Sequence, residues 1–79
     1  MLKGSREAVL RKVQPISVHG QISLDVHFVY PDDDTEQVRV ARIGPEAMAQ
    51  GLEAGDRVIL DFVLGVVTQV KRAPGGSGA

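Results

Sequence analysis

The sequence contains no cysteine and no tryptophan, and its only aromatic residues are two phenylalanines and one tyrosine. The absence of cysteine excludes disulfides and thiolate chemistry and makes a cytoplasmic location the default expectation. It also removes the usual ligands of structural zinc, and His19 and His27 do not have the spacing of a zinc-binding helix. The sequence therefore predicts neither a metal nor a cofactor.

Long apolar runs are also absent. No segment approaches the roughly 20 apolar residues of a membrane helix, and no signal peptide is recognisable after Met1, so no membrane partner is expected. Nine Lys and Arg against ten Asp and Glu give a net charge of −1, which does not indicate a strongly basic nucleic-acid protein. The 79 residues allow one domain, expected at residues 1–73, followed by a flexible Gly-rich tail at 74–79.

Alternation of apolar and polar residues predicts β structure. The clearest strand covers residues 22–30, where every second residue is apolar. Further strands are expected at residues 6–16, with a bulge before Val13, and at 38–43. Residues 57–72 are expected to form either two strands that meet near Gly65 or one long strand that bends there. Residues 44–51 predict a short helix, because a proline suits its first position and a glycine suits the left-handed residue after its last turn.

This order of elements predicts an all-β fold, a small five- to six-stranded OB-like barrel with one short helix between strands three and four. The same alternation predicts which side chains are buried. The expected core consists of Leu10, Val13, Ile22, Leu24, Val26, Phe28, Val40, Leu52, Val58, Leu60, Phe62 and Val70.

Two segments of the second half resemble known families. Gly55-Asp56-Arg57-Val58, together with residues 65–72, is similar to the closing strands of small OB-fold proteins of the bacterial translation initiation factor one type. Residues 38–60 resemble the GD box of cradle-loop barrels, and the Gly-Leu-x-x-Gly-Asp string at 51–56 is also similar to PDZ domains. All three resemblances imply a small β-rich domain, and they differ in the strand connectivity that they imply.

The sequence offers no recognisable catalytic arrangement. No nucleophile and base occur at a characteristic spacing, and the glycines at 51 and 55 follow the predicted helix, whereas phosphate loops precede one. The run Asp32-Asp33-Asp34 is typical of a solvated turn, because calcium loops place carboxylates at alternate positions around a glycine. We therefore expect a binding module and not an enzyme.

Two binding surfaces remain open alternatives. In the first, strands one to three of an OB barrel present a basic strip that continues where the last strand meets the first. This strip would bind single-stranded DNA or RNA weakly through Arg11, Lys12, Arg39, Arg42, Lys71 and Arg72. In the second, an apolar outer face binds a protein partner or a second copy through Val29, Val63 and Val67. The three aromatic residues are in phase with the core, and only Tyr30 is expected to expose its hydroxyl end.

Overall fold

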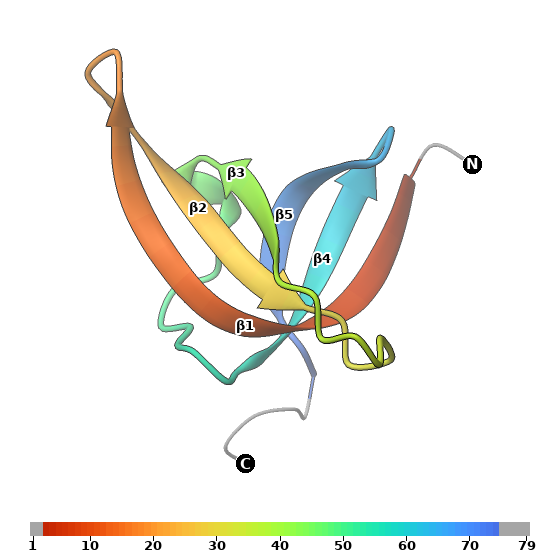
Figure 1. The fold of residues 1–79 in the computed structure, drawn as a ribbon. Coiled ribbons are helices and arrows are strands. Elements are labelled where there is room, and N and C mark those ends of the chain that lie inside the picture. Colours follow the sequence, from red (N-terminus) through yellow and green to blue (C-terminus); the bar gives the residue numbers. More distant parts are fainter. Residues whose placement is uncertain (1–2, 75–79) are drawn as a thin grey trace.

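The computed structural model describes residues 3–74, which form one antiparallel sheet of five strands and a short 3-10 helix. The sheet order is β3-β2-β1-β4-β5, so the long first strand pairs with both the second and the fourth (Figure 1). This order confirms the predicted all-β, OB-like fold. The elements are β1 (Lys3–Val18), β2 (Gln21–Val29), β3 (Arg39–Ile43), η1 (Pro45–Ala47), β4 (Arg57–Val63) and β5 (Val66–Arg72).

The predicted tail at 74–79 lies outside the described residues except for Pro74. Within residues 3–74, the sheet curls around its core but does not close into a complete barrel, since no ladder joins β3 to β5. The segment after η1 crosses one end of this opening. The N–H of Ala49 donates to the carbonyl oxygen of Val70 at 2.9 Å, and Met48 forms a parallel bridge to the same residue. The remainder of the β3–β5 opening is unpaired.

The helix is shorter than predicted because the N–H of Ala49 donates to the carbonyl oxygen of Val70 in β5. Ala47 and Met48 donate their N–H groups three residues back, to Gly44 and Pro45, which gives a single 3-10 turn. In an α-helix the N–H of Ala49 would donate to Pro45, but here it donates to β5. The helix predicted over residues 44–51 therefore ends after Ala47, because the next residue pairs with the sheet.

The structure confirms the bulge in β1 that was predicted before Val13. The register with β2 shifts between Leu10 and Lys12, which leaves Arg11 as an extra residue. An extra residue moves the side chains that follow it to the other face of the sheet. Leu10 and Val13, three residues apart, consequently both pack toward the core.

A second bulge lies in β5 and was not predicted. Phe62 pairs with Val67 and the register then shifts, so that Thr68 is the extra residue. Val67 and Val70 therefore both turn inward, and Val67 packs against the core. The prediction of Val67 on an apolar outer face is wrong for this reason.

The core lies inside the curled sheet, and most of the predicted residues are found there. Leu10, Val26, Phe28, Val58, Leu60 and Val70 are buried, while Val13, Leu24, Leu52 and Phe62 are partly buried against them. Ala8, Tyr30 and Ile43 complete the cluster. The core is small. Within residues 3–74, six of its residues have no exposed surface, namely Ala8, Leu10, Val26, Val58, Leu60 and Val70.

Two core predictions are wrong, for Ile22 and Val40, whose exposures are both 54%. In β3 the residues opposite the inward side chains of β2 are Ala41 and Ile43, so Val40 points outward. Ile22 lies on the same face of β2 as the inward-facing Val26 and Phe28. However, β3 pairs with β2 only from Leu24 onward, so it does not extend as far as Ile22. The tip of the β1–β2 hairpin extends beyond the rest of the sheet and leaves this side chain uncovered (Figure 1).

Candidate interaction surface

The six basic residues proposed for nucleic acid do not form one strip. Arg39 lies opposite the inward-facing Phe28, whereas Arg42 lies opposite Asp25 on the other face of the sheet. The continuation along the last strand is also wrong, because β5 pairs with β4, and β4 separates it from β1. Lys71 on β5 lies opposite Ile59, away from the β1–β2–β3 half of the sheet.

Five of these six cations are paired with a carboxylate of the same chain. Within residues 3–74, Lys12 is the exception. Pairing of this kind at the surface stabilises the fold by only about 0–1 kcal/mol, but it neutralises the local charge. The nitrogen–oxygen distances are 3.4 Å for Arg11–Glu36, 3.8 Å for Arg39–Asp33, 2.9 Å for Arg42–Asp25, 2.9 Å for Lys71–Asp61 and 3.8 Å for Arg72–Asp56.

Three of the surface carboxylates are held in their ionised form. Hydrogen bonding from the Arg42 guanidinium lowers the pKa of Asp25. Hydrogen bonds from the side chain and the N–H of Thr35 lower the pKa of Asp33, and those from Lys71 and Ser5 lower the pKa of Asp61. These groups remain anionic partners of the basic residues at neutral pH.

The aromatic rings are not exposed stacking platforms. Phe28 is buried and Phe62 is partly buried. Tyr30 is only 7% exposed as a whole residue, so its ring is largely covered, and the predicted exposure of its hydroxyl end stays a prediction. The guanidinium carbon of Arg6 lies 3.5 Å from the centroid of its ring, and that of Arg39 lies 5.2 Å away. The two arginines lie over the ring of Tyr30.

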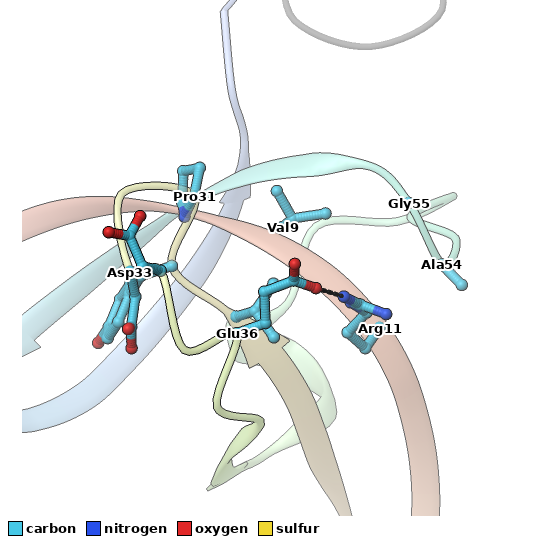
Figure 2. Close-up of a pocket in the computed structure, with 10 residues that line it drawn as sticks. Val9, Arg11, Pro31, Asp33, Glu36, Ala54 and Gly55 are labelled. Atoms are coloured by element: carbon cyan, nitrogen blue, oxygen red, sulfur yellow. Dashed lines mark hydrogen bonds and ion pairs between the residues drawn. The ribbon is translucent and has the colours of Figure 1, made fainter.

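The loop between β2 and β3 covers a hollow of about 680 Å³, shown in Figure 2. Val9 and Val29, a cross-strand pair, lie among its lining residues. Val29 is only 6% exposed, so its predicted place on an outer interaction face is wrong. Two carboxylates that line this hollow have partners of their own, since Glu36 pairs with Arg11 and Asp33 accepts hydrogen bonds from Thr35. Residues 3–74 contain no group of three or more side chains that could hold a metal ion.

Four exposed apolar side chains lie on β3, at the end of β4, in the β4–β5 turn and at the start of β5. Val40 on β3 and Val66 on β5 both line a hollow of about 410 Å³ in the β3–β5 opening. Val63 and Leu64 precede Val66 in the β4–β5 hairpin. We call these four residues the rim; their exposures are 54% for Val40, 36% for Val63, 69% for Leu64 and 62% for Val66. Of the three residues predicted for an apolar contact surface, Val63 alone belongs to the rim.

Leu64 has an unusual conformation for its residue type. It forms the two-residue turn between β4 and β5 with Gly65, and the φ angles of the two are 54° and 78°. Two positive φ angles are required by a type I′ turn, which favours Asn, Asp or Gly at its first position. A bulky leucine rarely adopts positive φ. The other two-residue turn has His19 there, a residue type that tolerates this region better.

Leu64 was not among the residues singled out from the sequence. The available signal was a leucine directly before the glycine that separates two strands, a position where turn chemistry favours a small polar residue. The alternation of residues 58–70 placed Leu64 in phase with the core and hid this signal. In the folded chain it is the most exposed large apolar residue among residues 3–74.

No protein-family model, curated protein or solved structure matches this chain. The resemblances to initiation factor one proteins and to cradle-loop barrels therefore stay predictions. Within the described part of the chain, no helix has the length and apolar character needed to cross a membrane.

Proposed function

We propose that this chain is a non-catalytic binding module whose ligand is a protein and whose contact surface is the rim. The observation that carries this proposal is Leu64, which is 69% exposed and has a φ of 54°. Left-handed backbone costs a non-glycine residue about 1–2 kcal/mol, and exposure gives the leucine side chain no compensating burial. An apolar side chain held in such a position is well suited to a contact outside its own chain.

The chemistry around the rim supports a protein ligand. The hollow beside Val40 and Val66 has Phe28 and Phe62 among its lining residues. An apolar side chain of a partner can enter such a hollow and lose its contact with water, which is how the strongest contacts of protein interfaces arise. The nearby Arg42 is already paired with Asp25, so a neutral partner leaves no new charge unpaired.

Site-specific crosslinking tests the proposal. A photoreactive residue replaces Leu64 in one variant and Ile22 in a second, and each purified chain is irradiated in an extract of the source cells. Ile22 is the matched control because it is an apolar side chain, 54% exposed, on the distant hairpin tip. We expect protein adducts from position 64 and only background from position 22. Equal labelling from both positions, or none from either, would contradict a protein contact at the rim.

Single-stranded nucleic acid is a second candidate, favoured by one observation. Two hollows that share Phe62 and Gly65 are lined by four cations and by no carboxylate. The cations are Lys3, Arg6, Arg39 and Arg42. Because the last three are paired with aspartates and the rings are mostly covered, we expect weak and sequence-tolerant binding.

Fluorescence anisotropy with a labelled oligonucleotide tests this candidate at low and moderate salt. Binding should weaken with salt, each phosphate contact adding about 0.7 to the log–log slope. The double variant Arg39→Glu, Arg42→Glu should abolish it, whereas Arg57→Glu, which removes a cation outside the two hollows, should not. Absence of binding at low salt would reject nucleic acid as the ligand and leave the protein contact as the remaining proposal.

A further inference from the structure

We infer that the protein bound by the rim is a second copy of this chain. The inference rests on the proposed function and names its partner. The first support is that disulfides are absent and that residues 3–74 lack a metal site, two features that stabilise many small domains. Small domains commonly supplement a small core with disulfides, a structural metal or association. This chain has no cysteine, and residues 3–74 contain no cluster able to hold a metal. Association is another way to supplement a small core, and the exposed apolar side chains of the rim offer a surface for it.

The second support is the neutrality of the surface. A two-fold symmetric contact places a surface against its own copy, so an unbalanced charge would repel itself. On the β3 side of the opening, Arg42 is paired with Asp25 at 2.9 Å and Arg39 with Asp33 at 3.8 Å. On the β5 side, Lys71 is paired with Asp61 at 2.9 Å. Two copies of the rim can therefore face each other without like-charge repulsion from Arg39, Arg42 and Lys71. Lys3, which lies opposite Val63, has no carboxylate partner within residues 3–74.

The third support is an unprotected strand edge beside the rim. β3 and β5 are the edge strands of the sheet, and residues 66–69 of β5, Val-Val-Thr-Gln, include neither a charge nor a proline. Free edges are usually protected by such residues. The far part of β1, which β4 does not cover, contains both Lys12 and Pro15. Charges are thus present on the β1 edge, on β3, which has Arg39 and Arg42, and at the end of β5, which has Lys71 and Arg72. Residues 66–69 lack them, as expected where a second copy covers that segment.

Sedimentation velocity on the full chain tests this inference from low to high micromolar concentration. We expect the mass to rise with concentration from 8.5 kDa to twice that value. Val40→Glu and Val66→Glu should remain monomeric throughout. The matched control is Ile22→Glu, because Ile22 and Val40 have the same 54% exposure and only Val40 lies in the rim. The control should dimerise as the parent does, and high salt should not dissociate the parent dimer, since the contact is apolar.

A monomer at every concentration would overturn the second-copy inference, and so would a dimer that Val40→Glu and Val66→Glu leave intact. Failure of the inference is distinguishable from failure of the proposed function. If the chain stays monomeric but position 64 still crosslinks to another protein while position 22 does not, the rim contact stands and its partner is a different chain. If both experiments fail, the rim has no protein partner.

Discussion

Arg42 on β3 lies directly opposite Asp25 on β2, and its guanidinium contacts both carboxylate oxygens at 2.9 Å and 3.4 Å. This contact holds the pKa of Asp25 below its ordinary value. Because the pKa is depressed in the folded chain, the stabilisation is present above the unfolded-state pKa and is lost as the pH falls through the folded-state pKa.

The first prediction follows from this pair. Arg42→Gln should raise the pKa of Asp25 toward the ordinary 3.8, because the largest cause of its depression is removed. A carbon-13 NMR titration of the Asp25 carboxyl group measures the change. Arg57→Gln is the control and should leave Asp25 unchanged. An unaltered Asp25 titration in Arg42→Gln would show that the pair does not form in solution.

The second prediction concerns the core. Leu60 is fully buried, so Leu60→Ala should lower the free energy of unfolding by about 2–5 kcal/mol through lost transfer energy and a residual cavity. Ile22→Ala on the exposed hairpin tip should change it by less than about 0.5 kcal/mol. Urea denaturation monitored by circular dichroism measures both. A small effect of Leu60→Ala would mean that Leu60 and the residues on its face of β4 do not point toward the core.

The third prediction separates two neighbouring valines. The bulge at Thr68 turns Val67 toward the core, whereas Val66 is 62% exposed. Val67→Asp should therefore destabilise the monomer by about 1–3 kcal/mol, because it places a carboxylate against apolar side chains. Val66→Asp should have little effect when measured at a concentration too low for association. Equal effects at the two positions would contradict the bulge.

The sequence predicted the parts of the fold that one strand determines by itself. The alternation over residues 22–30 correctly indicated β2 and the burial of Val26 and Phe28. The bulge in β1 was correctly predicted, because the apolar residues Leu10 and Val13 are three positions apart instead of two. This spacing is visible in the sequence without knowledge of the partner strand.

Features that depend on pairing between distant segments were missed. The face of Val40 is set by the register of β3 on β2, in which Ala41 takes the inward position opposite Val26. The inward turn of Val67 results from a bulge against β4, and the short η1 results from the contact between Ala49 and β5. The candidate site was missed for a related reason, because Leu64 shares the parity of the core and only the turn reveals its exposure.

We propose that Leu64 serves a contact outside its own chain and does not stabilise the monomer. Urea denaturation of Leu64→Asn and of the parent, at a concentration where both are monomeric, tests it most directly. Asparagine tolerates positive φ and suits the first position of a type I′ turn before glycine. We expect Leu64→Asn to be about 1 kcal/mol more stable than the parent monomer and to lose dimerisation in sedimentation velocity at high micromolar concentration. A less stable Leu64→Asn monomer would show instead that the leucine packs within its own chain.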